Sequence, residues 1–166
     1  ELFFDGTLIH VKDLNSSNGT YLNQKQVHMA VADDGDTIQI GDFSFTFMDA
    51  GLLHDLDVIR EALGKPLTVN GGGYLWSGFR TPEYSGYSPT SAHSQGKAVD
   101  IKLSGWSRHD FSNGTVQEVQ ETIRNLKMSG QLKYITRMEL NTANWVHIDV
   151  LNAEPNEPSG LYTFNP

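Results

Sequence analysis

Two histidines and one aspartate stand in two short runs of the sequence that together could hold a metal ion. His93 and Asp100 lie seven positions apart in Ser91–Ile101, and His147 follows in Trp145–Val150. Two imidazoles and one carboxylate suit a zinc ion, and three protein ligands leave a fourth tetrahedral position open for water. The pattern predicts one Zn²⁺ ion at a catalytic type of site. The alternative is that both histidines are ordinary buried or surface residues.

The residues around these ligands predict the strands that would position them. Val99–Ile101 and Val146–Ile148 each place one polar residue between two apolar ones, the alternation of a half-buried strand. Asp100 and His147 would then point to one face of a sheet while their neighbours anchor the core. The small residue Gly96 lets the backbone turn tightly ahead of the first of these strands.

Three runs in this order resemble the zinc D-alanyl-D-alanine carboxypeptidase family. They are Ser77–Glu83 (SGFRTPE), Ser91–Ile101 (SAHSQGKAVDI) and Val146–Val150 (VHIDV), and the resemblance covers about Leu52 to Val150. That family includes phage endolysin peptidases and vancomycin-resistance D,D-dipeptidases, and it shares its metal site with the hedgehog signalling domain. The resemblance implies a substrate among the D-amino-acid-containing stem peptides of bacterial peptidoglycan.

Arg80 lies in the first of these runs and is a candidate catalytic residue. A guanidinium stays charged and can donate two parallel hydrogen bonds to a substrate carboxylate or to a developing oxyanion. The alternative is a structural ion pair with Glu83 or Asp100.

Glu139 is the candidate general base. Tyr134–Leu140 and Trp145–Val150 predict an antiparallel hairpin, which would bring Glu139 alongside the strand that carries His147. A general base must lie within hydrogen-bond reach of the water that it activates. The alternative is a salt bridge between Glu139 and a neighbouring arginine, either Arg137 or Arg80.

Three further residues near the site differ in their predicted roles. In the dipeptidase branch of the family the base glutamate lies three positions before the second histidine ligand, and that position is Asn144 here. Asn144 cannot accept a proton, so it is not expected to act as the base. Asp149 lies two residues after His147 and could orient that imidazole. His109 matches no spacing and is expected on the surface.

The first fifty residues predict a small antiparallel β unit. Short runs rich in β-branched and aromatic residues alternate with turn clusters; the runs are Leu8–Val11, Thr20–Leu22, Thr37–Ile40 and Phe43–Phe47. Asp13–Tyr21 and Asp34–Gly41 resemble the second half of a forkhead-associated (FHA) domain, a β-sandwich that binds phosphothreonine peptides. The arginine and serine that grip the phosphate belong to the first half of that fold, so Asn18-Gly19 alone is not expected to prefer a phosphorylated peptide. The alternative is that Asn18-Gly19 is simply a tight turn, since both residues suit positive φ.

The periodicity changes near Asp49, which predicts two domains, residues 1–49 and residues 50–166. Apolar residues at helical spacing predict a helix over Leu52–Leu63, ended by Gly64. A capping box at Thr115–Glu118 predicts a second helix, whose buried stripe would be Val116, Val119, Ile123 and Leu126. The tail ends in Leu161–Phe164, which predicts a terminal strand or docking segment.

Composition narrows the function classes. The net charge of −8 argues against a nucleic-acid partner, because phosphates need a basic surface. No apolar run is long enough for a membrane span, and the absence of cysteine excludes disulfides and thiolate ligands. The chain starts at Glu1 without a signal-peptide pattern, which predicts a processed chain or a fragment.

Together these patterns predict an α+β fold: an antiparallel-sheet zinc peptidase domain with flanking helices, preceded by a partial FHA-like β-sandwich. The hypothesis is a zinc peptidase acting on peptidoglycan stem peptides outside the cell, in the periplasm or on a phage particle. It could be a carboxypeptidase or an endopeptidase. The alternatives are a metal-binding recognition protein of the hedgehog type and a phosphopeptide-binding module. The partner of the half β-sandwich is not predicted.

Overall fold

The fold is taken from a computed structural model of the chain, which describes residues 1–5, 8–33, 35–69, 78–80, 84–103, 113–142 and 144–166. Its described elements are twelve strands and two helices, so the mixed α+β prediction is confirmed.

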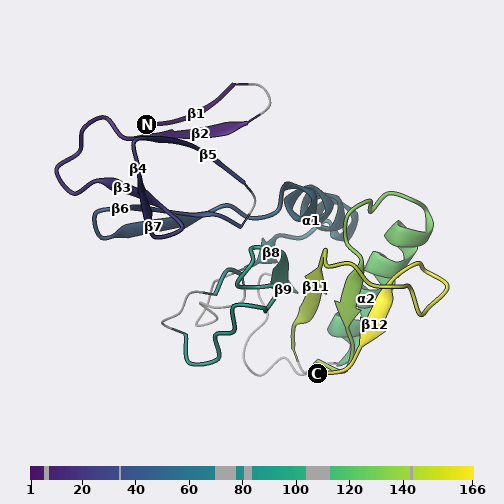
Figure 1. Ribbon diagram of the computed structural model, residues 1–166. Helices are drawn as coiled ribbons and strands as arrows, with labels where there is room; N and C mark the ends of the chain where they lie inside the picture. The colour runs from purple at the N-terminus through teal and green to yellow at the C-terminus, as the bar shows by residue number, and fades with distance from the viewer. Residues whose placement is uncertain (6–7, 34, 70–77, 81–83, 104–112, 143) are drawn as a thin grey trace.

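The N-terminal part of the chain folds into two antiparallel sheets, which we call the β module (residues 1–47, Figure 1). One sheet has the order β1-β2-β5, and the other has the order β4-β3-β6-β7. The strands are β1 Leu2–Phe4, β2 Ile9–Lys12, β3 Thr20–Leu22, β4 Lys25–Val27, β5 Met29–Ala32, β6 Thr37–Ile40 and β7 Phe43–Thr46. The predicted runs correspond to β2, β3, β6 and β7, whereas the sequence patterns did not predict β1, β4 and β5.

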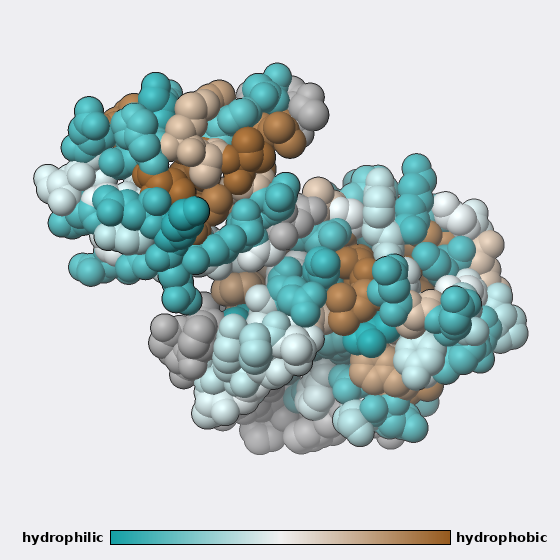
Figure 2. Space-filling model, viewed as in Figure 1, coloured by the Kyte–Doolittle hydropathy of each residue, from teal (hydrophilic) through white to brown (hydrophobic). Residues whose placement is uncertain are grey.

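The core of the β module is small. Val11, Ala32 and Ile38 are its buried apolar residues. Ile38 and Phe43 lie on one face of their sheet, because Ile38 pairs with Phe45 and Ile40 pairs with Phe43. Yet Phe43 is 71% exposed, while Ile38 is fully buried. Only part of this inner sheet face is therefore covered, and apolar residues appear on the surface of the β module in Figure 2.

The first helix, α1 (Ala50–Leu63), begins two residues before its predicted start. Asp49 caps it by accepting a hydrogen bond from the Leu52 amide, and Gly64 ends it in the left-handed conformation. Leu52 and Ile59 are fully buried on its inner face.

A five-stranded sheet with the order β12-β10-β11-β9-β8 follows. Its strands are β8 Leu67–Thr68, β9 Ala98–Leu103, β10 Arg137–Glu139, β11 Val146–Asp149 and β12 Tyr162–Phe164. The neighbours pair antiparallel except for β10 and β12, which run parallel. The predicted antiparallel sheet is thus confirmed except at this edge, where β12 pairs parallel with β10. After β11 the chain leaves the sheet and re-enters it as β12, which runs in the same direction as β10.

The two faces of this sheet differ in chemistry. One face carries apolar residues, and the buried stripes of α1 and α2 (Asn113–Met128) pack on it. The predicted stripe of α2 is buried, which confirms it. The strand residues of the apolar face are Val99, Ile101, Met138, Val146 and Ile148. Because side chains alternate along a strand, Asp100, Glu139, His147 and Asp149 share the opposite face.

Two predicted boundaries are corrected. Helix α2 begins at Asn113, so Thr115 lies in its first turn and not at the cap. The predicted strand Tyr134–Leu140 is shortened to Arg137–Glu139. The physical reason is Asp55 of α1, a fully buried carboxylate that accepts hydrogen bonds from the amides of Lys133, Tyr134 and Ile135. Those amides are therefore not available to a sheet neighbour.

The β module touches the segment that carries His93. A Cβ atom added at Gly35 would lie 2.5 Å from the Gln95 carbonyl oxygen, and one added at Gly96 would lie 2.7 Å from the Phe47 carbonyl oxygen. The Asp49 amide also donates to the Gly96 carbonyl at 2.9 Å. Backbone therefore packs on backbone here, at two glycines with positive φ.

Neither described helix has the length and apolar character to cross a membrane.

Candidate metal centre

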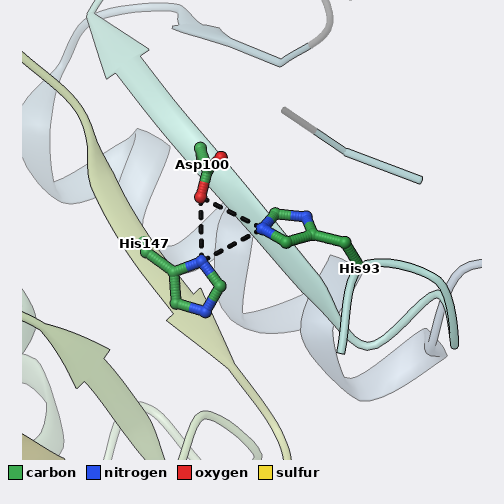
Figure 3. A group of neighbouring side chains, drawn as sticks. All are labelled: His93, Asp100 and His147. Carbon is green, nitrogen blue, oxygen red and sulfur yellow. Dashed lines mark hydrogen bonds and ion pairs between the residues drawn. The ribbon is translucent and has the colours of Figure 1, made fainter. Parts of the chain in front are cut away.

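His93, Asp100 and His147 converge at one point, as Figure 3 shows. His93 Nε2 lies 3.1 Å from His147 Nδ1 and 3.2 Å from Asp100 Oδ1, and His147 Nδ1 lies 2.8 Å from the same oxygen. Asp100 and His147 are direct cross-strand partners on β9 and β11. His93 reaches them from the loop before β9. The group is partly to fully buried and can hold a metal ion.

The outer nitrogen of each imidazole is held by a separate oxygen. His93 Nδ1 lies 2.8 Å from the Gly78 carbonyl oxygen, and His147 Nε2 lies 3.1 Å from Asp149 Oδ2. A carbonyl can only accept, so His93 Nδ1 carries the proton, and an ionised Asp149 places a proton on His147 Nε2 in the same way. In the neutral imidazoles the remaining lone pairs then point at each other and at Asp100. Only a proton or a cation stabilises that arrangement. Asp149 thus lies within hydrogen-bond distance of His147 Nε2, as its predicted role in orienting that imidazole requires.

The charges of the site follow from these contacts. Burial by itself raises the pKa of Asp100, but the hydrogen bonds from His147 and His93 outweigh it and hold the pKa far below its ordinary value. Burial lowers the pKa of His147, but the hydrogen bonds to Asp100 and Asp149 outweigh it and raise the pKa to about 9. Without a metal, the centre therefore keeps a proton on His147 at neutral pH.

Asp149 is itself held by Arg137. The Arg137 Nε lies 2.8 Å from Oδ1 and Nη2 lies 2.7 Å from Oδ2, an almost ideal two-pronged pair. Burial alone raises the pKa of Asp149, yet the hydrogen bonds from His147 and Arg137 lower it overall. Asp149 is fully buried, so this carboxylate stays charged inside the protein because His147, Arg137 and the Leu151 amide all donate to it.

The metal-binding group opens into a cavity of about 480 Å³. Glu139 lines it, and continuing the register of β10 and β11 by one pair places Glu139 opposite His147. Trp145 and Phe164 form apolar parts of the wall, with the Phe164 ring edge-on to His147 at 5.9 Å between centroids. The cavity thus combines a cation site, a carboxylate and apolar surface.

Each of the two arginines near the site pairs with a carboxylate, and only the pair made by Arg80 was among the predicted alternatives. Arg80 lines the cavity and donates through Nη2 to Asp100 Oδ2 at 3.1 Å, one of its two predicted structural pairs. Arg137 pairs with Asp149 across the hairpin, and the alternative prediction of a pair with Glu139 is not among the ion pairs of the described residues. Arg80 thus contacts Asp100, which belongs to the metal-binding group. Arg137 contacts Asp149, which in turn contacts His147.

The remaining predicted residues fall elsewhere. Asn144 accepts a hydrogen bond from Lys102 at 3.3 Å, and its exclusion as the base remains a prediction. Glu83 and His109 lie outside the described residues. Arg137 and Phe164 line the cavity although neither was predicted to belong to the site. Arg137 could have been found from the hairpin register, which sets it opposite Asp149. Phe164 had no such signal, because its position depends on the parallel pairing of β12.

Comparison with known families gives one result, at the N-terminal end of the chain. Residues 1–41 match the FHA domain. This FHA match supports the partial β-sandwich prediction for the β module, and it supports peptide recognition as an alternative function. It ends before β7 and does not reach the metal-binding group. No curated protein and no solved structure matches the chain.

Proposed function

We propose that the chain is a zinc-dependent peptidase whose metal centre is His93, Asp100 and His147. The observation that carries this proposal is the set of converging lone pairs on the three inward-facing atoms, in a cavity that a further carboxylate, Glu139, also lines. A structural metal site normally has four protein ligands. In the part of the chain that the structure describes, this group has three.

The ligand set favours zinc over the hard cations. Calcium and magnesium prefer oxygen ligands, whereas imidazole with carboxylate suits zinc. Tetrahedral bonds of about 2.0–2.2 Å give edges of roughly 3.3–3.6 Å. The three distances between ligand atoms, 2.8, 3.1 and 3.2 Å, need only a small outward movement to reach that size. The oxygens behind both imidazoles supply the outer contacts that orient zinc ligands.

We assign the following roles to the side chains of the cavity. His93, Asp100 and His147 would hold the zinc ion, which would lower the pKa of a bound water to about 7 and polarise a carbonyl. Glu139, opposite His147, takes the proton from water and delivers it to the leaving amine. Arg80, beside Asp100, supplies positive charge where the carbonyl oxygen becomes negative.

The substrate class rests on the resemblance of three sequence runs to the zinc D-alanyl-D-alanine carboxypeptidases. We infer hydrolysis of peptide bonds in peptidoglycan stem peptides, and hence work at a cell wall, whether outside the cell, in the periplasm or on a phage particle. The mixed polar and aromatic wall of the cavity is consistent with a peptide substrate.

The first test is cleavage of a D-Ala-D-Ala-terminated peptide by the zinc-loaded chain, with and without a chelator. Cleavage should stop on chelation and in His147→Ala, which should also lose bound zinc by elemental analysis. Glu139→Gln should reduce the rate about 10²–10⁴-fold with zinc content unchanged. Asn144→Ala, the matched control, should cost far less, because Asn144 is held by Lys102.

Three results would contradict the proposal or one of its assigned roles. Full zinc occupancy in His147→Ala would place the ion elsewhere. Zinc binding without cleavage of peptides or of purified peptidoglycan would instead favour the hedgehog-like alternative, a metal-binding recognition protein. Most activity remaining in Glu139→Gln would mean that another group is the base.

A second candidate function, favoured by the FHA match, is peptide recognition by the β module. The turn after β2 is well ordered by Asp13, whose carboxylate accepts hydrogen bonds from the Ser16 and Thr20 hydroxyls. That carboxylate makes the turn acidic, so we expect no preference for phosphothreonine over unmodified threonine. Titration with a matched pair of peptides tests this. Micromolar binding of the phosphorylated peptide alone would contradict it.

A further inference from the structure

Arg137 uses only one edge of its guanidinium group within the protein. A guanidinium has five N–H donors on a rigid plane. Nε and Nη2 both donate to Asp149. Among the described residues, Nη1 has no hydrogen-bond partner, and its side of the plane forms a second two-pronged edge. The Arg137 side chain is 25% exposed, which shows that solvent reaches it despite the pair with Asp149.

Arg137 lines the same cavity as the metal-binding group. Its Cζ lies 5.0 Å from the centroid of the Phe164 ring, and this contact fixes the guanidinium plane against the wall of the cavity. Asp149 and Phe164 together therefore hold Arg137 in one orientation before any ligand arrives, which lowers the entropic cost of binding.

The charge balance of the loaded site favours an anion. Arg80 and Asp100 cancel, and so do Arg137 and Asp149. A divalent ion and the Glu139 carboxylate then leave one net positive charge. An uncharged peptide would not use this surplus, whereas a peptide with a carboxylate would.

The two arginines lie on opposite sides of the metal-binding group. Arg80 contacts Asp100 on β9, and Arg137 lies on β10 beyond His147 and next to β12. The strands β9 and β10 are two strand spacings apart, about 10 Å, so we assign the two arginines to different groups of the substrate. Arg80 lies beside a metal ligand, which suits the oxyanion, and Arg137 lies two residue pairs from the Glu139–His147 pair, opposite Asp149.

We propose that the second edge of Arg137 binds a carboxylate of the peptide substrate, so that the site selects acidic over amidated peptides. This proposal rests on the proposed peptidase function, because it names the substrate chemistry of the same cavity. The carboxylate can belong to the C-terminus of the peptide or to an acidic residue next to the cleaved bond. Both present the same planar pair of oxygens that a guanidinium edge recognises.

The test measures binding and not cleavage. Zinc-loaded Glu139→Gln protein is titrated by calorimetry with three peptides: an N-acetylated D-Ala-D-Ala peptide with a free C-terminal carboxylate, its C-terminal amide, and the same amide with one acidic residue before the scissile bond. At least one carboxylate-bearing peptide should bind about 10-fold or more tightly than the neutral amide. Which of the two does so identifies the source of the carboxylate.

The deciding variant is Arg137→Lys in the same background. Lysine keeps a positive charge opposite Asp149 but has no second planar edge, so the preference for the acid should fall to about 3-fold or less. The matched control is Arg124→Lys, because Arg124 pairs with Glu157 and does not line the cavity. It should leave the preference unchanged. All titrations are made at saturating zinc, so that any change in zinc affinity is excluded.

The outcomes separate this inference from the proposed function. Equal binding of acid and amide, a preference that survives in Arg137→Lys, or no binding of any peptide would each overturn the inference. Cleavage by the wild-type chain could persist in the first two cases. Conversely, a preference lost only in Arg137→Lys supports the inference even in a chain that cleaves slowly.

Discussion

Arg137 and Asp149 lie directly opposite each other on β10 and β11, and their side chains form a two-pronged ion pair of 2.7 and 2.8 Å. Asp149 also contacts the outer nitrogen of His147. One cross-strand pair therefore determines how a metal-binding imidazole is oriented. A hairpin is well suited to this task, since its register fixes both partners at once.

Asp149→Asn should weaken zinc binding about 10–100-fold, the usual cost of removing an outer partner of a zinc ligand. The amide can still accept from His147, but it no longer carries the negative charge that Arg137 neutralises. Zinc affinity measured by competition with a chromophoric chelator checks this. Asp57→Asn, at a side chain that is 73% exposed on α1, is the control and should leave the affinity unchanged. Equal affinities in both variants would contradict the role of Asp149.

Zinc binding at pH 7 should release about one proton. The pKa of His147 is raised to about 9 in the metal-free protein, so its imidazole is protonated at pH 7, whereas a metal ligand must be neutral. The apparent zinc affinity should therefore rise about tenfold per pH unit between pH 7 and 8. Calorimetry in two buffers with different ionisation enthalpies measures the proton count. A heat that is independent of the buffer would contradict the prediction.

Asp55→Ala should destabilise the fold by about 3 kcal/mol or more. The buried carboxylate satisfies three backbone amides, and its removal leaves them without acceptors. Urea unfolding gives the free energy of unfolding. Asp57→Ala on the same helix should change it by less than about 0.5 kcal/mol, because its pair with Arg60 is exposed. Similar losses in both variants would show that Asp55 is not a structural anchor.

Gly35→Ala should cost more stability than Gly130→Ala, and it alone should weaken zinc binding. Both glycines have positive φ, 85° and 75°, so alanine is similarly strained at each. Only at Gly35 would the new Cβ meet backbone, the Gln95 carbonyl oxygen at 2.5 Å. We expect a difference of about 1–3 kcal/mol, typical of overpacking. Thermal unfolding and zinc titration measure the two effects, and equal behaviour of the variants would refute the contact.

The parts of the site that depend on local alternation could be predicted from the sequence. Val-Asp-Ile and Val-His-Ile place Asp100 and His147 on one sheet face, and the structure sets them in register. The hairpin placed Glu139 near His147 by the same reasoning. These predictions need only the period of a strand and the length of a loop.

The parts that depend on distant segments could not be predicted. Asp55 lies in a helix pattern where a charged residue is normally solvent-facing, yet it determines where β10 begins, some eighty positions later. Phe164 reaches the cavity only because β12 pairs parallel with β10. Nothing in the periodicity of a three-residue strand specifies its direction. The same holds for β4 and β5, whose residues show little apolar alternation.

The close contact of Gly35 with Gln95, and of Gly96 with Phe47, has a consequence for how this chain could have diverged. Neither glycine position has room for a side chain, so a β module from another protein would fit beside this metal-binding loop only if it also had a residue without a side chain at the position of Gly35. A change on either side must be matched on the other. The two halves of the chain are thus expected to have been inherited together and not exchanged as independent units.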